Sequence, residues 1–234
     1  MDIVYPVRPG DRNEELRHSL RSLSNLPHGN VWVVGHKPPW VIDVGHLQTR
    51  QVGMKHENAG RNLVTACQSD DITDDFVWMN DDFYVMHPID EVPTFNRGPI
   101  SGVLAEMRRR RGNRTDSRYI TRMAATLRRL KELGYEHPLS FELHVPMVLN
   151  RRGVLDALRA MATSRDLTAY NKRTSFGVIT GLEGARIRDP KVNFSWQSWS
   201  KSTPFLSTSD RTFNSTTVGR HIRTTFPTPS PYER

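Results

Sequence analysis

The sequence predicts an α/β domain with a mainly parallel sheet flanked by helices. Apolar runs typical of buried strands occupy residues 3–7, 31–35 and 76–79. Segments of helical period, 12–23 and 57–69, lie between them. Strands that alternate with helices form βαβ units, whose strands are parallel. At 234 residues the chain is long enough for one such domain with a sizeable core.

Composition excludes several classes of protein. The single cysteine, Cys67, excludes an internal disulfide framework and a cysteine-based metal cluster. No apolar run approaches the length of a membrane span, and the first residues begin a strand rather than a signal peptide. We therefore expect a cytoplasmic protein. The net charge of +8 favours an anionic partner such as a nucleotide, a phosphorylated sugar or a nucleic acid.

The first unit is predicted as a strand at 3–7, a basic loop and a helix. Asp11 stands three residues before Glu14, which is the spacing of a capping box at a helix start. Arg8 and Arg12 would lie at the amino end of this helix, where backbone N–H groups and the macrodipole favour phosphate. In the alternative interpretation Asp11 only caps the helix and the arginines are surface charges. We prefer a phosphate contact.

Two further strands are predicted at 31–35 and 44–51, followed by the helix at 57–69. One face of that helix carries a polar set at steps of three and four residues, consisting of Asn58, Arg61, Asn62 and Thr65. Asparagine is a poor helix former, so it is an unusual choice for a merely solvated face. We expect Asn58, Arg61 and Asn62 to contact a nucleotide base, ribose or diphosphate.

The next strand, 76–79, runs directly into Asn80, Asp81 and Asp82. In open α/β sheets ligands bind at the carboxyl edge of the strands. Adjacent carboxylates repel each other, so a site that keeps both ionised usually holds a hard cation such as Mg²⁺ or Mn²⁺. The alternative is a solvated turn, because Asp and Asn are common turn residues. Both interpretations stay open on these residues alone.

Several of these motifs carry a resemblance to known enzymes. The chain resembles the successive motifs of the stealth-type sugar-phosphate transferases at Tyr5, at residues 12–23 and 31–34, at the pair Pro39-Trp40, at residues 78–83 and at the pair His87-Pro88. Those enzymes build capsular polysaccharides from nucleotide sugars. The pattern is also similar to small GT-A-like glycosyltransferases of tailed bacteriophages. The resemblance covers residues 1 to about 90.

The resemblance implies a GT-A-like (Rossmann-like) fold and an enzyme that moves a sugar from a nucleotide-diphosphate sugar to a glycan, a protein or modified DNA. Asn80, Asp81 and Asp82 would take the part of the metal-binding Asp-x-Asp motif. Asp82 would then hold Mn²⁺ or Mg²⁺, with Asp81 or Asn80 at the sugar or ribose. Asn80 departs from the motif, because many GT-A enzymes carry Asp there. The stealth reaction, transfer of sugar-1-phosphate, is an alternative. A phage-encoded enzyme would work in the host cytoplasm.

A later stretch, 140–145, alternates cleanly and predicts a strand with Glu142 and His144 on one face. An edge strand with a solvated polar face is the alternative. Together with Pro146, this stretch resembles a later stealth motif containing His and Pro. The resemblance implies that Glu142 is the general base and that His144 is a further metal ligand or base.

The one dense basic cluster lies at 108–114, and Arg128, Arg129 and Lys131 extend it along a helix that is predicted to end at Gly134. Such a cluster is more often a solvated face than a binding surface. A non-catalytic, basic nucleic-acid-binding protein is nevertheless the rival hypothesis from another class. No helix-turn-helix, zinc-finger or RNA-recognition signature accompanies the cluster.

The last segment is rich in Ser, Thr and Pro and shows no helical period. The sequence therefore predicts two parts, a catalytic domain at 1–199 and an extended C-terminal tail at 200–234 that lies on or over the site. Such a tail could bring Ser209, Asp210, His221 or Arg223 to the diphosphate or the metal.

Overall fold

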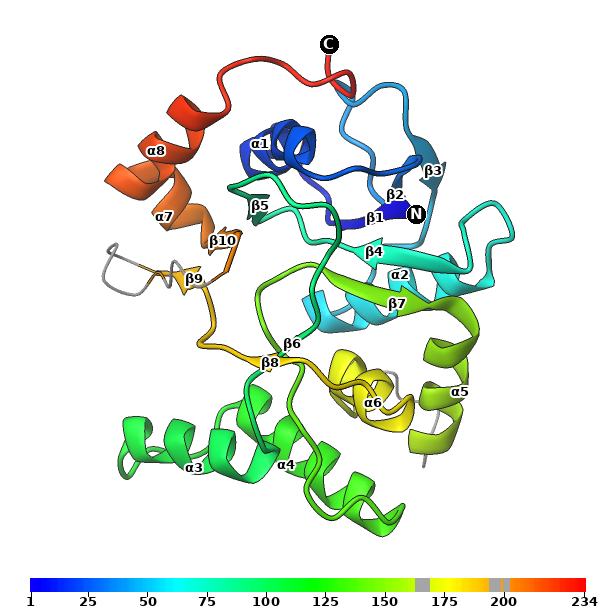
Figure 1. Cartoon of the computed structure of the whole chain (residues 1–234), viewed down its shortest axis with the longest axis vertical. Helices are drawn as coiled ribbons and strands as arrows, with labels where there is room; N and C mark the ends of the chain where they lie inside the picture. The colour runs from blue at the N-terminus through cyan, green and yellow to red at the C-terminus, as the bar shows by residue number, and fades with distance from the viewer. Residues whose placement is uncertain (163–168, 194–198, 200–202) are drawn as a thin grey trace. The chain divides into compact units, whose positions relative to one another are not determined.

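A computed structural model of the chain describes residues 1–162, 169–193, 199 and 203–234 (Figure 1). The chain divides into two compact units. The sheet unit comprises Met1–Pro93, His144–Arg151 and Asp189–Arg234, and the helical unit comprises Thr94–Leu143 and Arg152–Arg188. This division differs from the predicted one, because the end of the chain belongs to the same unit as its beginning.

The sheet unit is built on a five-stranded, mainly parallel sheet of order β3-β2-β1-β4-β7. Its strands are β1 (Asp2–Val7), β2 (Val31–Gly35), β3 (Gly45–Leu47), β4 (Asp75–Trp78) and β7 (Met147–Asn150). β1 pairs in parallel with both β2 and β4, β3 is parallel to β2, and only β7 is antiparallel. The prediction of an α/β fold with a mainly parallel sheet is confirmed, although β3 is shorter than the expected 44–51.

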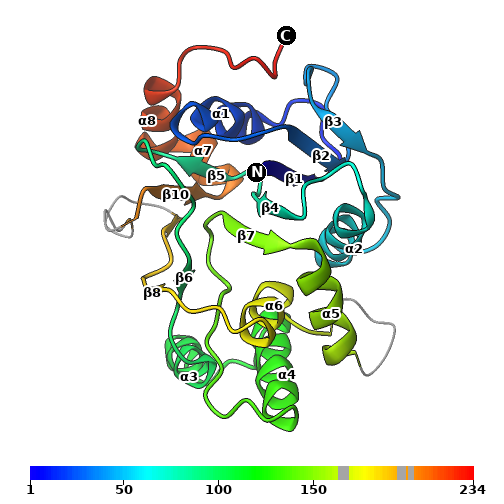
Figure 2. The same ribbon diagram turned by 45° about the vertical axis from the view of Figure 1, so that its right-hand side comes forward.

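Helices cover the sheet on two sides. Helix α1 (Glu14–Ser22) connects β1 to β2, and α2 (Lys55–Gln68) connects β3 to β4. These crossovers run in opposite directions along the sheet, so the usual right-handed connection puts the helices on opposite faces. Figures 1 and 2 show this arrangement. Both faces of the central strands are covered, which is why Ile3, Val4 and Tyr5 are all fully buried.

The start of α1 differs from the expected capping box at Asp11. The cap is Asn13, whose side-chain oxygen accepts the N–H of Leu16 at 3.1 Å. Asn13 has a φ of 32°, a left-handed conformation that asparagine adopts more readily than most residues. The turn at the helix start therefore lies two residues later than the spacing indicated, and a 3-10 turn, η1 (Leu23–Asn25), follows the helix.

The predicted extended tail is wrong, because the described residues 203–234 contain regular elements. They form β10 (Phe205–Thr208), α7 (Asp210–Ser215) and α8 (Thr217–Thr225). β10 is the middle strand of a second sheet, antiparallel to β5 (Phe83–Val85) and parallel to β9 (Lys191–Val192). The helices bury an apolar cluster against this sheet, and its members include Tyr84, Leu206, Phe213, Val218 and Ile222. This segment is part of the core.

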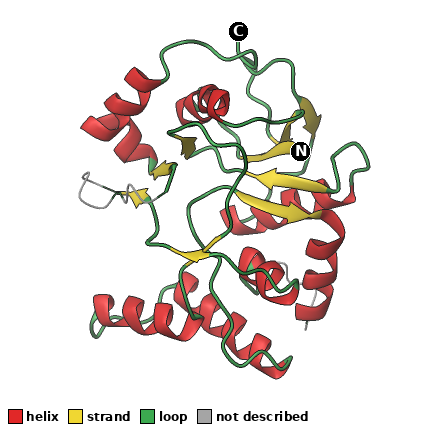
Figure 3. Ribbon diagram, viewed as in Figure 1, coloured by secondary structure: helices red, strands yellow, loops and turns green. Residues whose placement is uncertain are grey.

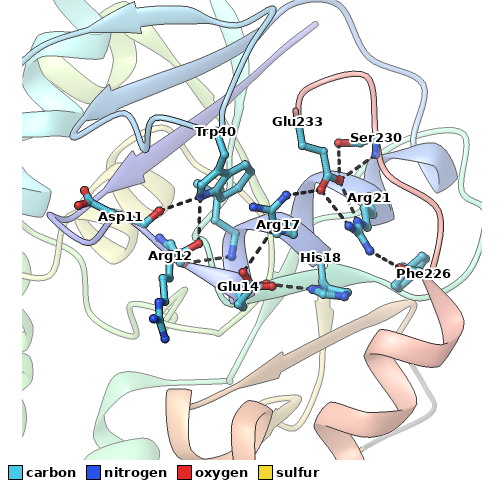
Figure 4. Close-up of polar contacts among 12 residues, drawn as sticks. Asp11, Arg12, Glu14, Arg17, His18, Arg21, Trp40, Phe226, Ser230 and Glu233 are labelled. Atoms are coloured by element: carbon cyan, nitrogen blue, oxygen red, sulfur yellow. Dashed lines mark hydrogen bonds and ion pairs between the residues drawn. The ribbon is translucent and has the colours of Figure 1, made fainter.

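The final residues fasten to α1 through Glu233 (Figure 4). The Glu233 carboxylate pairs with Arg17 and Arg21, each with an N···O distance of 2.8 Å, and accepts the N–H of Ser230 at 2.8 Å. Burial by itself raises the pKa of Glu233, but these hydrogen bonds, those from Arg21 foremost, lower it to about 2. Arg17 also lies 4.0 Å from the centre of the Trp40 ring.

The helical unit is built on α3 (Ile100–Arg111) and α4 (Arg118–Glu132). Its other elements are β6 (Phe95–Asn96), most of α5 (Arg151–Met161), α6 (Lys172–Ile179) and β8 (Ala185–Arg186). α3 and α4 share a buried core that includes Ile100, Val103, Leu104, Ile120, Met123 and Leu130. The structure confirms the predicted helix that ends near Gly134, whose φ of +95° suits a glycine just past a helix end. Figure 3 shows that helices dominate this unit.

The predicted strand at 140–145 is wrong, since residues 140–146 form no strand and β7 begins only at Met147. The Phe141 N–H donates to Oγ1 of Thr174 at 3.1 Å, and the Leu143 N–H donates to the carbonyl of Phe141 at 2.9 Å. These bonds bend the backbone and take donors that a neighbouring strand would need. The alternating pattern nevertheless predicted correctly which side chains are buried, because Phe141, Leu143 and Val145 all are.

No helix among the described residues is long and apolar enough to cross a membrane.

Candidate functional site

A cavity of about 360 Å³ lies within the sheet unit, and we call it the edge cavity. The residues after β1 and after β4, the first half of α2, and residues of β9 and the start of α7 form its walls. Its lining consists of Pro6, Arg8, Glu15, Gln51, Lys55, Asn58, Ala59, Asn62, Asn80, Asp81, Asp82, Lys191, Ser209 and Asp210. The strand order reverses between β1 and β4, because the chain first builds β2 and β3 on one side of β1 and then returns to the other. Ligands of open α/β sheets bind outside the carboxyl ends of the strands at such a reversal.

Two adjacent carboxylates lie at the end of β4 in this cavity. Asp81 Oδ2 accepts a hydrogen bond from Nδ2 of Asn13 at 3.1 Å, and Asp82 Oδ2 pairs with Nζ of Lys191 at 3.0 Å. Burial raises the pKa of Asp81, and the neighbouring charge of Asp82 adds to the rise. The hydrogen bond from Asn13 and the charges of Arg8 and Lys55 oppose it. A cation here would relieve the repulsion between the carboxylates.

A third carboxyl group in the lining, that of Glu15 on α1, is buried and has a raised pKa. Its Oε1 accepts a hydrogen bond from Oγ1 of Thr208 at 2.9 Å. Burial raises the pKa of Glu15 to about 8; the hydrogen bond from Thr208 opposes the rise, and the nearby aspartates add to it. The same burial and the same neighbouring charges thus make ionisation of Glu15 less favourable than that of a solvated glutamate.

Cations and amides form the rest of the wall. Arg8 and Lys55 supply positive charge, and the amide side chains are Gln51, Asn58, Asn62 and Asn80. Nε2 of Gln51 donates to Oγ1 of Thr49 at 2.5 Å and to Oδ1 of Asn62 at 2.9 Å. Over the described part of the chain, Oε1 of Gln51 is buried and accepts no hydrogen bond. An unpaired buried acceptor costs about 1–3 kcal/mol.

The residues of the predicted polar face of α2 differ in what they contact: some line the edge cavity and some hold neighbouring backbone. Asn58 and Asn62 line the edge cavity, but the Asn62 amide also donates to the carbonyl of Val34 at 3.0 Å and is buried. Arg61 donates to Oδ1 of Asn58 at 2.9 Å and to the carbonyl of Arg50 at 2.8 Å. Arg61 therefore holds the loop before α2 and orients Asn58. Asn62 anchors the helix to β2.

Arg12 lines a second cavity of about 550 Å³, which we call the flanking cavity. It shares the residues Arg8, Glu15 and Asp210 with the edge cavity, so the two spaces adjoin. The Arg12 carbonyl accepts a hydrogen bond from the Trp40 indole at 2.9 Å, which fixes the backbone of this loop. Both arginines predicted at the amino end of α1 thus line the flanking cavity, and Arg8 alone also lines the edge cavity.

The expected catalytic pair Glu142 and His144 is not held together on one strand. Glu142 belongs to the helical unit, where its carboxylate accepts the N–H of Thr174 at 3.1 Å near the start of α6. His144 belongs to the sheet unit, where its N–H and Nδ1 contact the Asp189 carboxylate at 3.1 and 2.9 Å. A strand would have kept Glu142 and His144 on one face. Because the chain bends at Leu143 instead, the two residues belong to different units.

The donor set of the edge cavity fits a hard divalent cation bound together with a substrate. Among residues that the structure describes, no three His, Cys, Asp or Glu side chains are grouped so that they could hold a metal ion. His144 therefore does not join Asp81 and Asp82 in such a group. Mg²⁺ is commonly held by one or two carboxylates and the phosphates of a substrate, and Asp81 with Asp82 meets that requirement.

Several residues that line the edge cavity were not predicted from the sequence. Glu15 was absorbed into the helical pattern of α1, and Lys55 precedes the predicted start of its helix. Gln51 ends a predicted strand. Lys191 lies 109 positions from its partner Asp82, and no local pattern connects residues at such a separation. Ser209 and Asp210, which the sequence offered as tail contacts, do line the edge cavity, whereas Arg223 donates to the carbonyl of Phe213.

Comparison with protein-family models and with curated proteins finds no match to this chain.

Proposed function

We propose that the protein is a GT-A-like glycosyltransferase that moves a sugar from a nucleotide-diphosphate sugar to an acceptor with the help of Mn²⁺ or Mg²⁺. The observation that carries the proposal is the edge cavity, which puts adjacent carboxylates and three cations at the reversal point of an α/β sheet. Few ligands need both signs of charge in one cavity. A nucleotide diphosphate bound with a divalent cation does.

The donor would be held from three sides. Gln51 and Asn58, which line the cavity, offer amide groups to the base or ribose. Arg8 and Lys55 would contact the diphosphate. Asp82, with Asp81, would hold the cation, and Lys191, which now pairs with Asp82, would turn to a phosphate oxygen. When bound, the cation would act as a Lewis acid that stabilises the charge of the leaving diphosphate.

In the reaction, the acceptor oxygen bonds to the anomeric carbon while the bond from that carbon to the phosphate oxygen breaks. The acceptor proton passes to a carboxylate. Asp210 is the candidate base of the sheet unit, because it is exposed and belongs to both the edge cavity and the flanking cavity. Arg8 and Lys55 then face the diphosphate as its charge develops, which is where fixed cations accelerate such a step. The acceptor would enter through the flanking cavity.

The first prediction concerns donor binding. A thermal-shift screen of UDP-, GDP-, ADP- and CMP-sugars, with and without Mn²⁺, should reveal one that stabilises the protein only with the metal. A ligand at one hundred times its Kd stabilises the folded state by about 2.7 kcal/mol, which such a screen detects. Asp82→Asn should abolish the metal-dependent shift.

Asp90→Asn is the matched control, because it removes an exposed carboxylate that does not line the edge cavity. The control should keep the full shift. A wild-type protein that responds to none of the nucleotide sugars would refute the proposal, and an equal response from both variants would refute the role of Asp82. For a responding donor, the mass of the product separates transfer of a sugar from transfer of a sugar phosphate.

A further inference from the structure

The charge of the chain is divided unequally between its two units. The helical unit contains 18 of the 33 Lys and Arg residues but only 8 of the 25 Asp and Glu residues, so its net charge is +10. The sheet unit, with the remaining 15 cations and 17 anions, has a net charge of −2. The basic character of the protein therefore belongs to the helical unit, which contributes no residue to the lining of the edge cavity.

Within this unit, the cations gather on α3, on α4 and on the loop between them. Arg109 and Arg114 are exposed at the end of α3 and in the loop, and Arg128 and Lys131 are exposed on α4. Across the described chain none of these four has a hydrogen bond or an ion pair from its side chain. Neighbouring arginines do have partners, as Arg108 pairs with Asp116 at 2.6 Å. The four unpaired side chains are available to an external anion.

Helix stability alone does not account for this arrangement. Cations in the last turn of a helix interact favourably with its macrodipole, which explains part of the arginine run at 108–111. That effect does not reach Arg114, which lies past the helix end. It also does not explain why the cations of α4 should lie on the groove that α4 forms with α3. This groove is lined by Leu104, Arg108, Ala124, Leu127, Arg128, Lys131 and Glu132.

The surface is also supported by a firm scaffold. α3 and α4 share a buried apolar core, so the basic side chains extend from two helices packed against each other (Figure 2). Arginine supplies 16 of the 18 cations in the unit. Its planar guanidinium matches phosphate with two parallel hydrogen bonds, which lysine does not. A surface that faces several phosphates in a row would have this composition.

We infer that the α3–α4 surface, defined by Arg109, Arg114, Arg128 and Lys131, docks the phosphate backbone of double-stranded DNA. Binding there is independent of base sequence, because the contacts are to phosphates. A membrane surface fits less well. Helices that lie on membranes present a broad apolar face, whereas Leu133 is the one large exposed apolar side chain among the helical unit's described residues. The inference does not depend on the proposed transferase activity.

The second prediction follows from counterion release. Fluorescence anisotropy with a labelled duplex of about 20 base pairs, measured from 50 to 200 mM salt, gives the dependence of log K on log salt. Each phosphate contact contributes about 0.9 to the slope, so the triple variant Arg109→Ala/Arg114→Ala/Arg128→Ala should lose about 2.7 from it. The affinity at low salt should fall by at least tenfold.

A control variant, Lys37→Ala/Arg50→Ala/Arg220→Ala, removes the same charge from the sheet unit. Its slope of log K against log salt should differ from that of the wild type by less than about 0.9, the value for one phosphate contact. Circular dichroism should show that both variants are folded. Equal losses in the two variants would mean that net charge alone attracts DNA, which would overturn the assignment of the surface. Absence of DNA binding at 50 mM salt would overturn it as well, as would binding to phosphatidylserine vesicles but not to the duplex. Donor-induced thermal shifts should be unchanged in the triple variant.

Discussion

At the scale of single residues, the edge cavity is distinguished by a buried carboxyl group that holds its proton far above the usual range. Glu15 is 7% exposed, and its pKa is raised from 4.5 to about 8, chiefly by burial. The same side chain on a solvated helix would be ionised at pH 7. The raised pKa reflects this burial together with the charges of Asp81, Asp82 and Asp210, which line the same cavity.

The third prediction is a pH dependence of stability. Between pH 4.5 and about 8 the folded protein keeps the Glu15 proton and the unfolded chain releases it, so the free energy of unfolding falls as pH rises. One such group contributes a slope of at most about 1.4 kcal/mol per pH unit. Urea unfolding of Glu15→Gln between pH 5 and 8 should show a flatter dependence than the wild type. Parallel curves for the two proteins would show that Glu15 titrates normally.

At the scale of elements, the contact between the final residues and α1 depends on one buried ion-pair cluster. The Glu233 side chain is 1% exposed, and the two arginines that it joins are 20% and 13% exposed. In addition, Tyr232 bonds to His28 at 2.8 Å, and the Arg234 N–H donates to the Trp40 carbonyl at 3.0 Å. A helix near the start of the chain is thus held by residues more than 200 positions away.

The fourth prediction is that Glu233→Gln destabilises the protein by roughly 3 kcal/mol, because two arginines lose their buried partner. Glu14→Gln is the control, since the Glu14–Arg17 pair is longer, at 3.4 Å, and partly exposed. It should cost less than about 1 kcal/mol. Chemical denaturation at pH 7 measures both. A Glu233→Gln protein as stable as the control would refute the role of the cluster.

Because the pKa of Glu233 is lowered, its contribution to the free energy of unfolding should decrease in acid. Its stabilising contribution is complete above the ordinary pKa of 4.5 and disappears as pH falls toward about 2. The difference in unfolding free energy between wild type and Glu233→Gln should therefore shrink over that range. A difference that stays constant from pH 5 to 2 would contradict the ion-pair explanation.

At the scale of the whole molecule, the sheet unit is assembled from three separate stretches of chain, and the last stretch completes it. β10 is the central strand of the second sheet, and residues from β10 to Phe226 make up much of the buried cluster around Tyr84 and Met86. Without them, β5 would lose its pairing partner and the cluster would be open to water.

The fifth prediction follows. Deleting residues 200–234 should leave a chain without a cooperative thermal transition by circular dichroism, whereas a dispensable tail would leave the transition unchanged. Loss of several large apolar side chains from one cluster exceeds the total stability of a typical domain, since each costs about 2–5 kcal/mol. A truncated protein that unfolds cooperatively near the wild-type temperature would contradict this.

Sequence reasoning succeeded where one local pattern decided the outcome. The runs that form β1, β2 and β4 could be identified because they are apolar and rich in residues that favour strands. Residues directly after parallel strands must share one edge of the sheet. For that reason Arg8, Asn80, Asp81 and Asp82 could be expected in one cavity. The expectation about 140–145 was wrong because alternation reports burial, and a bent chain can bury alternate residues without pairing as a strand.

The sequence by itself determined the α/β class, the parallel sheet and the polar residues that follow its strands, because period and propensity are local properties. Only the tertiary structure decided that burial raises the pKa of Glu15, that Lys191 pairs with Asp82, and that residues 203–234 complete the core. Each of these depends on contacts between residues far apart in the chain. Burial and charge environments arise when such residues meet, so no short segment contains them.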